Sequence, residues 1–316
     1  MGNFCNKSYF EGPKKETKFN EEKITELLEE VNNDPEISKL EQEVPCFEFV
    51  HNYYFEGTNN FFRKIDYDYE GPESVKRVGV SQLTGNDSNG IWVYTGECLV
   101  GSKLPDGRGI LVHLGEKTRF IGYFHEGRKN GFGRLVSREK LLEGDWFQGV
   151  LNGQGKEVTK SKCSYTGGFR NGAYEGLGKA WYGDGSSYTG EFKHGEREGY
   201  GEYIWQDNSK YQGDWKEGKL NGQGTYTDKN GNYYEGEWKD NKMDGFGEFT
   251  WSDGKKYKGN YFEDQKHGYG EFYWANGKVW RGNWAYGKRH GQGESRVDGV
   301  PRVGIWQDDV FQKWIS

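Results

Sequence analysis

Residues 211–233 read YQGDWKEGKLNGQGTYTDKNGNY, and this stretch of 23 residues decides the fold. Tyr211, Gly213 and Trp215 alternate with polar residues, which is the period of a β-strand with one apolar face. A glycine between two aromatic residues weakens a strand unless it makes room for a neighbouring ring over the backbone. The stretch therefore predicts a strand with one aromatic and one solvated face.

The rest of the stretch predicts a loop, a second strand and a turn. Residues 218–222 are expected to form the loop, and the Gly-x-Gly that ends it opens the second strand. Asn-Gly and Asp-Gly between strands favour a two-residue type I′ turn, in which both residues have positive φ. Each unit is therefore predicted to be a hairpin that ends in such a turn. These dipeptides lie at Asp184-Gly185, Asn230-Gly231, Asp253-Gly254 and Asn276-Gly277.

The same pattern recurs along most of the chain. Successive glycines of the aromatic-x-Gly triplet, starting from Gly96, are 26, 22 and then six times 23 residues apart. A fixed period over about two hundred residues predicts a repeat architecture. The repeat glycines after the first are Gly122, Gly144, Gly167, Gly190, Gly213, Gly236, Gly259 and Gly282.

An aromatic residue follows each of these glycines by two positions. The resulting aromatic stripe consists of Phe124, Trp146, Phe169, Phe192, Trp215, Trp238, Tyr261 and Trp284. In a single-layer sheet the rings either shield one another as a core or form an exposed partner surface. We favour the core, with partners using the loops and the polar face.

Nine units predict an all-β fold: an elongated, twisted antiparallel β-meander of hairpin repeats with about eighteen strands. A small α-helical and irregular extension precedes it, and a repeat array needs a cap at each end. The expected segments are a polar arm (1–19), short helices (20–45), an irregular N-terminal cap with a degenerate repeat (46–93), the repeats (94–304) and a C-terminal cap (305–316).

Two short helices are predicted within residues 20–45. Ile24 and Val31, with two leucines between them, lie on one helix face. Asp34 followed by Pro35 indicates the start of a second helix. The helices either pack on the N-terminal end of the repeat domain or dock in the groove of a partner.

These units resemble MORN repeats, whose unit reads roughly Tyr-x-Gly-x-Trp-x-x-Gly-x-x-x-Gly-x-Gly. Residues 188–201 match it, with Phe192 in the Trp place. The resemblance covers residues 94–306, and it implies a protein that holds others together. MORN proteins are scaffolds between membrane and cytoskeleton, components of ciliary axonemes, or regulatory modules on enzymes. Departures from the unit are Cys98 in the Trp place, Leu142 in the Tyr place, and Asn241 and Asp264 in place of the mid-loop glycine.

Charge and composition exclude several other classes. The net charge of −6 lies entirely within the first 50 residues, so the remaining chain has no basic domain for binding a nucleic acid backbone. The sequence contains no run of 18 apolar residues, so it predicts no membrane-spanning helix. The four cysteines are scattered without a CxxC pair, which fits a reducing compartment and gives no zinc motif.

No motif in the sequence indicates catalysis. No Walker A loop or Gly-x-Ser-x-Gly elbow occurs. His267 and His290 recur one repeat apart without a carboxylate or cysteine partner, and are best interpreted as solvated loop residues. The glutamates Glu202, Glu248 and Glu271 recur at one repeat position and predict a ladder of charge on the solvated face. We therefore expect no enzyme, no cofactor and no metal.

The first residues carry a lipidation signal. Gly2 would be an N-myristoylation acceptor after removal of Met1, and Cys5 a nearby palmitoylation site. Two acyl chains bind membranes stably, whereas one binds only marginally. Asn6 stands where Ser or Thr is usual, so an ordinary free N-terminus is the alternative.

Three hypotheses on function follow. The first is a non-catalytic scaffold in a large cytoskeletal assembly, with the cytoplasm and the ciliary axoneme as its expected location. The second is an acylated peripheral protein on the cytoplasmic face of a membrane, which links membrane to cytoskeleton. The third is a regulatory subunit of an enzyme supplied in trans. All three have proteins as partners.

Overall fold

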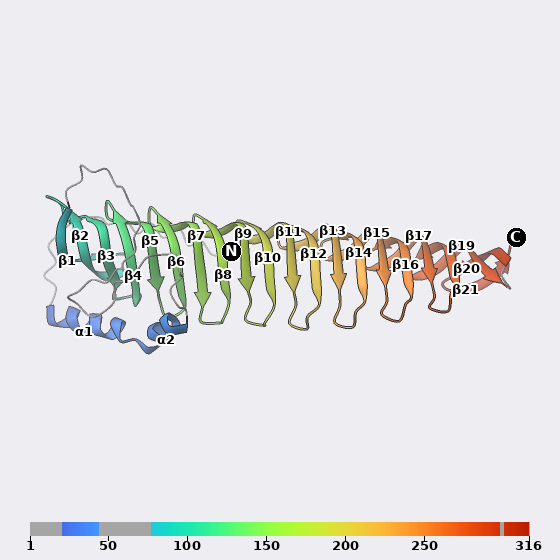
Figure 1. Cartoon of the computed structure of the whole chain (residues 1–316), viewed down its shortest axis with the longest axis horizontal. Coiled ribbons are helices and arrows are strands. Elements are labelled where there is room, and N and C mark those ends of the chain that lie inside the picture. The colour runs from blue at the N-terminus through green and yellow to red at the C-terminus, as the bar shows by residue number, and fades with distance from the viewer. Residues whose placement is uncertain (1–20, 44–76, 298–299, 316) are drawn as a thin grey trace. The chain divides into compact units, whose positions relative to one another are not determined.

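The computed structural model describes residues 21–43, 77–297 and 300–315 (Figure 1). These residues form two helices and 21 strands. Contacts divide the chain into two units, Met1–Ala173 and Tyr174–Ser316, which are described separately below. The polar arm with Gly2 and Cys5, and residues 46–76 of the expected N-terminal cap, lie outside the described residues.

In the first unit, each strand pairs antiparallel with its neighbours in sequence. Its elements are α1 (Glu21–Asn32), α2 (Pro35–Glu43), β1 (Arg77–Asp87), β2 (Gly90–Leu99), β3 (Pro105–His113), β4 (Thr118–His125), β5 (Arg128–Val136), β6 (Lys140–Phe147), β7 (Val150–Thr159) and β8 (Ser164–Arg170).

The second unit is likewise an antiparallel meander. Its strands are β9 (Ala173–Trp181, which starts at the last residue of the first unit), β10 (Ser187–Lys193), β11 (Glu196–Ile204), β12 (Lys210–Lys216), β13 (Lys219–Thr227), β14 (Tyr233–Lys239), β15 (Lys242–Thr250), β16 (Lys256–Phe262), β17 (Gln265–Tyr273), β18 (Val279–Ala285), β19 (Lys288–Val297), β20 (Val300–Gln307) and β21 (Val310–Trp314).

The predicted all-β meander of hairpin repeats is confirmed, with two strands per repeat from β2 to β19. Both described helices lie within the predicted stretch 20–45. Strand β1 falls inside the stretch 46–93 that was expected to be irregular, since its degenerate repeat sequence still alternates well enough to pair with β2. The expected C-terminal cap holds part of β20 and all of β21, so it too is regular strand.

The turns that join successive repeats differ from the prediction. At residues 228–232, Asp228 N donates to Asn232 O (2.9 Å) and Gly231 N donates to Asp228 O (3.1 Å). This is a three-residue loop, in which only the last residue, Gly231 (φ 82°), has positive φ. Such a loop combines a type I turn with a left-handed residue that forms a bulge. The predicted two-residue type I′ turn at Asn230-Gly231 is therefore wrong.

Type I′ geometry occurs instead within each repeat after the first, where a loop was predicted at residues 218–222. Glu217 (φ 49°) and Gly218 (φ 75°) form a two-residue turn between the paired residues Lys216 and Lys219. The other turns with two positive φ values are Glu126-Gly127, Gln148-Gly149, Asn171-Gly172, His194-Gly195, Asp240-Asn241, Glu263-Asp264, Tyr286-Gly287 and Asp308-Asp309.

We call the sheet face with the aromatic stripe the inner face, and the opposite face the outer face. In the first unit the outer face carries an aliphatic row on neighbouring strands, and Figure 1 shows both helices beside the lower ends of these strands, at right angles to them. Ile24, Val31 and Ile37 of the helices pack against this row in one core cluster. The row consists of Val93, Val112, Val136, Leu141 and Val158.

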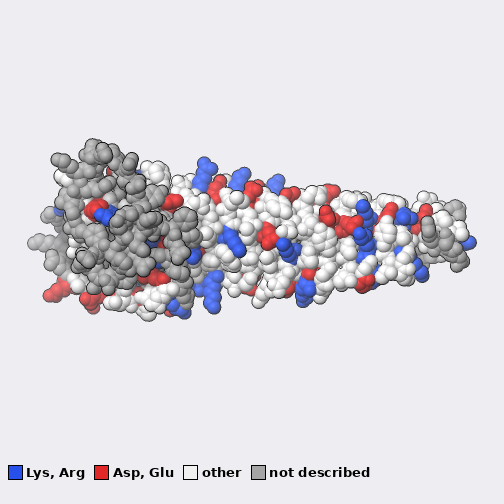
Figure 2. Space-filling model, in the orientation of Figure 1, with Lys and Arg blue, Asp and Glu red and all other residues white. Residues whose placement is uncertain are grey.

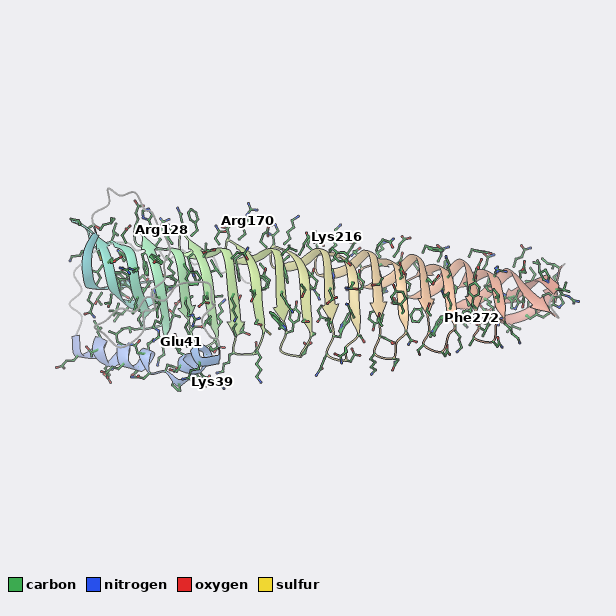
Figure 3. All side chains as sticks on the ribbon, in the orientation of Figure 1. Lys39, Glu41, Arg128, Arg170, Lys216 and Phe272 are labelled. Atoms are coloured by element: carbon green, nitrogen blue, oxygen red, sulfur yellow. The ribbon has the colours of Figure 1, made fainter. Side chains whose placement is uncertain are left out.

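Four ion pairs fix these acidic helices to basic residues of the strands and turns. Figure 3 shows Glu41 on the side of α2 that faces the strands and Lys39 on the other side. The Glu41 carboxylate accepts two hydrogen bonds from Arg119, at 2.6 and 2.5 Å. The other pairs are Arg138–Asp34 (2.7 Å), Lys160–Glu36 (3.1 Å) and Lys117–Glu30 (3.3 Å).

Asp34 caps α2, so replacing it is expected to loosen this helix. Its Oδ1 accepts hydrogen bonds from the backbone N–H groups of Glu36 (3.1 Å) and Ile37 (3.4 Å). We expect Asp34→Ala to cost about 1 kcal/mol, measured as faster hydrogen exchange in α2. Asp34→Asn retains a capping oxygen but loses the charge that pairs with Arg138. Equal loss of protection in both variants would assign the effect to the ion pair instead.

Candidate functional site: the aromatic face of the repeats

The structure places all eight residues of the aromatic stripe in the interior, with 2–9% of each side chain exposed. The first aromatic residue of the repeats is buried more deeply still, as Tyr188, Tyr211, Tyr234 and Tyr257 show. Burial of this extent favours a packing role for the stripe over an exposed binding surface.

The rings contact one another edge to face and connect each repeat to the next. Tyr211 packs against Trp215 of its own repeat and Trp238 of the following one, both with centroids 5.4 Å apart. Tyr234 packs in the same way against Trp238 (5.1 Å) and Tyr261 (5.4 Å). Such T-shaped pairs contribute about 0.5–1.5 kcal/mol beyond burial. In the second unit the resulting chain of rings continues through Trp280 to Trp306.

Glycines make room for the tyrosine rings. Gly213 and Gly224 lie opposite each other on paired strands, and the ring of Tyr211 lies over both. A Cβ on Gly213 would meet the hydroxyl of Tyr211 at 2.6 Å, too close for any real contact. That hydroxyl donates to the carbonyl of Asp214 (3.0 Å). The repeat glycines thus leave the space on the strand in which a tyrosine ring packs.

The indole N–H groups of the stripe tryptophans are satisfied by the glycine backbone of the preceding repeat. Trp238 Nε1 donates to Gly224 O (3.1 Å), and Trp215 Nε1 donates to Gly201 O (3.3 Å). Buried indoles need such partners. The stripe therefore fixes the stacking of repeats through hydrogen bonds as well as ring contacts.

A second aromatic row lies beside the stripe on the inner face of the second unit and is half-buried, except at Phe272, which is buried. Its residues come from the ends of the second strands, and Phe272 lies toward the opposite edge from Lys216 in Figure 3. The row includes Tyr203, Trp205, Tyr226, Phe249, Trp251, Phe272 and Trp274, which contact each other at 4.5–5.5 Å. Sequence reasoning did not assign this row, although the strand GEFTW at residues 247–251 signals it by alternation.

Two cations lie over this inner face, three repeats apart. The guanidinium carbon of Arg197 is 4.3 Å from the ring centroid of Trp215, and Lys266 Nζ is 4.6 Å from that of Trp284. Burial lowers the pKa of Lys266. Cations over aromatic faces are stabilised by the ring quadrupole. The inner face is therefore aromatic with spaced positive charge.

Lys129 of the first unit occupies the same repeat position as Lys266, and predicts a pH dependence of stability. Its Nζ lies 5.2 Å from the ring of Phe120 and 5.1 Å from that of Trp146. Burial lowers its pKa from 10.5 to about 8, opposed by Glu116. Between these values the unfolded chain binds a proton that the folded chain lacks, so Lys129 makes stability rise with pH there.

The variant Lys129→Met tests this, because Met243 occupies the same position in a later repeat. We expect a higher melting temperature at pH 7 and a smaller increase between pH 8 and 10, measured by thermal unfolding at a series of pH values. If the melting temperature of the variant depends on pH as that of the wild type does, burial does not disfavour the charged form of Lys129.

The residues considered for catalysis do not gather into a site. Among the described residues, no group of three or more His, Cys, Asp or Glu side chains could hold a metal. Glu202 pairs with Lys210 (2.6 Å) and Glu248 with Lys256 (2.6 Å), while Glu271 lies 3.4 Å from Arg281. The predicted ladder of glutamates is therefore a row of ion pairs.

His267 and His290 lie apart from these three glutamates. His267 packs between the rings of Phe262 (5.7 Å) and Tyr286 (5.3 Å), and His290 lies 3.4 Å from Asp308. His267 is thus a packed, partly buried side chain and not a solvated one, and the expectation that His290 lacks a carboxylate partner is wrong. In Figure 2, acidic and basic side chains are interspersed on the face in view. No described helix is long and apolar enough to cross a membrane.

Comparison with protein families identifies the repeats. The family model described as MORN repeat matches residues 120–139, 143–164, 165–187, 188–210, 211–233, 234–256, 257–279 and 280–296, more than half of the chain. The chain belongs to the MORN-repeat family. MORN-repeat proteins are generally non-catalytic, and the repeats indicate a scaffold role through protein interaction. The hairpin β2–β3, which holds Cys98, lies outside the matched segments but pairs like the MORN units.

Two further comparisons add little to this assignment. A search of curated proteins found no match. A similar solved structure is the SAS-4 (dCPAP) TCP domain of Drosophila melanogaster in complex with a proline-rich motif of Ana2 (dSTIL). It is 10% identical, has a TM-score of 0.26 and covers 41% of this chain and 77% of that chain. At this score the likeness does not bear on function.

Proposed function

We propose that this MORN-repeat protein is a non-catalytic scaffold of a large cytoskeletal assembly, with the ciliary axoneme as that assembly. The observation that carries the scaffold role is the half-buried aromatic row of the second unit. It recurs at two neighbouring repeat positions, the second interrupted by Asp228, and offers partner proteins a series of ring surfaces. Half-buried aromatic residues are typical anchors of protein interfaces. The axonemal location rests on the resemblance to MORN proteins of axonemes.

Fractionation of ciliated cells tests the location. We expect the protein in the detergent-resistant axonemal fraction, cross-linked to the same neighbours in each preparation. The double variant Trp205→Ser/Trp251→Ser removes two rings of the half-buried row and is expected to leave that fraction. The control Phe147→Ser removes an exposed ring in the first unit and should stay. A wild-type protein that is fully extracted by detergent would contradict the axonemal proposal.

The sequence motif at Gly2 and Cys5 favours a second candidate, an acylated scaffold that links a membrane to the cytoskeleton. Two acyl chains would anchor the chain to the cytoplasmic face of a membrane. Intact-mass analysis of the native protein tests this, with a myristoyl group on Gly2 as the expected result. An unmodified glycine, or membrane fractionation that persists in Gly2→Ala, would remove this candidate.

A further inference from the structure

The outer face of the second unit carries an exposed row that the stripe does not explain. The middle residue of each Gly-x-Gly points outward, because the glycine after it lies under an inner tyrosine ring, as at Gly201, Gly224, Gly247 and Gly270. In four repeats of this unit it is a large apolar residue with 49–74% of its surface exposed. Gln223 interrupts the row in the middle. The exposed residues are Leu177, Tyr200, Phe246 and Tyr269.

Carboxylates without a cation surround this row. Asp214 lies directly opposite Tyr200 on the paired strand, and Glu237 lies opposite Gln223. Both accept backbone N–H groups at the strand bulge, Asp214 from Gln223 (2.9 Å) and Glu237 from Phe246 (3.1 Å).

Glu191 and Glu235 add two more exposed carboxylates to this face. Within the described residues, no Lys or Arg pairs with any of these four. Glu202 and Glu248 on the same face differ, since each has its lysine. Exposed rings and carboxylates without a cation partner therefore lie together in the middle of this face, and Lys193, Lys216 and Lys239 lie two residues further along the same strands, next to the turns.

The first unit shows that the outer face of these repeats can hold a helix. There, α1 buries Ile24 and Val31, which are seven residues apart, against the row at the strand ends that includes Val136, four residues from the Gly-x-Gly position. Seven residues of helix rise about 10.5 Å, and two strands of a sheet span about 9.6 Å. A helix with apolar residues every seven positions therefore matches the step of one repeat. In that unit an acidic helix faces basic residues, Arg119 and Arg138 among them.

We propose that the outer face of the second unit docks a basic amphipathic helix of a partner protein, with apolar residues at seven-residue intervals. Phe246 and Tyr269 are one repeat apart and receive apolar residues i and i+7. Tyr200 lies two repeats before Phe246 and receives a residue about 13 positions away. Lysine and arginine beside these anchors pair with the carboxylates that lack a cation and stack on the rings. This partner class rests on the proposed scaffold function.

The charge also excludes the chain's own helices from this face. Helix α1 reads EEKITELLEEVN and α2 reads PEISKLEQE, so both are acidic. Placing either against Asp214, Glu235 and Glu237 would juxtapose like charges, which opposes binding. The occupant is therefore a partner of opposite charge and not α1 or α2 of a second copy.

Binding of designed peptides to the full chain tests the proposal. The probe is a fluorescein-labelled 21-residue helical peptide with leucine at positions 4, 11 and 18 and arginine on both flanks of that stripe. A second peptide has glutamate in place of arginine, and a third has the same composition with the leucines shuffled. Fluorescence anisotropy measures the affinities. We expect the arginine peptide to bind at least about tenfold more tightly than either of the others.

Single variants locate the binding face. Phe246→Ser and Glu235→Gln are each expected to weaken the arginine peptide about tenfold or more, as for central interface residues. Gln223→Ser, at the same position in the intervening repeat, should leave the affinity unchanged. Circular dichroism confirms that each variant is folded. Equal binding of the glutamate or shuffled peptide, or full affinity in both variants, would overturn the proposal. The test uses purified components, so its failure leaves the fractionation result for the scaffold role intact.

Discussion

Trp238→Ala is expected to lower the free energy of unfolding by about 3–5 kcal/mol, the range for truncating a large buried aromatic residue. Trp238 packs between Tyr211 of the preceding repeat and Tyr234 of its own. Its indole also donates to the carbonyl of Gly224 (3.1 Å). Truncation therefore leaves a cavity and an unpaired carbonyl between two repeats, and neighbouring repeats should unfold with it. Chemical unfolding followed by circular dichroism measures the loss.

A matched control separates packing from binding. Phe246→Ala removes a ring of similar size from the next repeat, but that ring is half exposed on the outer face. We expect it to change stability by about 0.5 kcal/mol or less. A Trp238→Ala protein with an unchanged melting temperature that no longer enters its assembly would contradict the core interpretation of the stripe.

Gly247→Ala is expected to cost about 1–3 kcal/mol, the range for overpacking a filled interior. A Cβ at this position would overlap the hydroxyl of Tyr234 and lie 2.6 Å from its ring carbons. The ring cannot withdraw readily, because it packs against Trp238 and Tyr261 on either side. Thermal and chemical unfolding report the change.

The double variant Gly247→Ala/Tyr234→Phe removes the atom nearest to the new methyl group. We expect it to be less destabilised than the sum of the two single variants, which is the signature of residues in direct contact. Strict additivity would show that the glycine is required for a reason other than the ring above it.

The strands could be predicted because each repeat shows the same alternation of aromatic or glycine residues with polar ones, as at Tyr211, Gly213 and Trp215. The turns could not. Glu217 takes a positive φ of 49°, a conformation that glutamate rarely adopts, so nothing in its identity marks a type I′ turn. Asn230-Gly231 has the composition of such a turn, yet three residues are needed there to connect the strands, and only the glycine is left-handed.

The burial of the stripe followed from its alternation, but the position of the helices did not. The helical faces of α1 and α2 were recognisable from Ile24, Val31 and Asp34. Their binding surface, which includes Val112 and Val136, is spread over separate repeats and becomes a row only when the strands pair. The half-buried aromatic row was missed for the same reason, since neighbours such as Trp205 and Tyr226 are 21 residues apart in sequence.

The chain of rings in the second unit also determines how that unit would respond to tension. Each ring contact reaches only the adjacent repeat, so a pull on one end loads one junction at a time. When a junction gives way, it releases 23 residues, about 80 Å of extended chain. The unit therefore extends in equal steps, and the remaining repeats stay folded while the tension falls. A tether built in this way yields stepwise under strain and does not rupture at once.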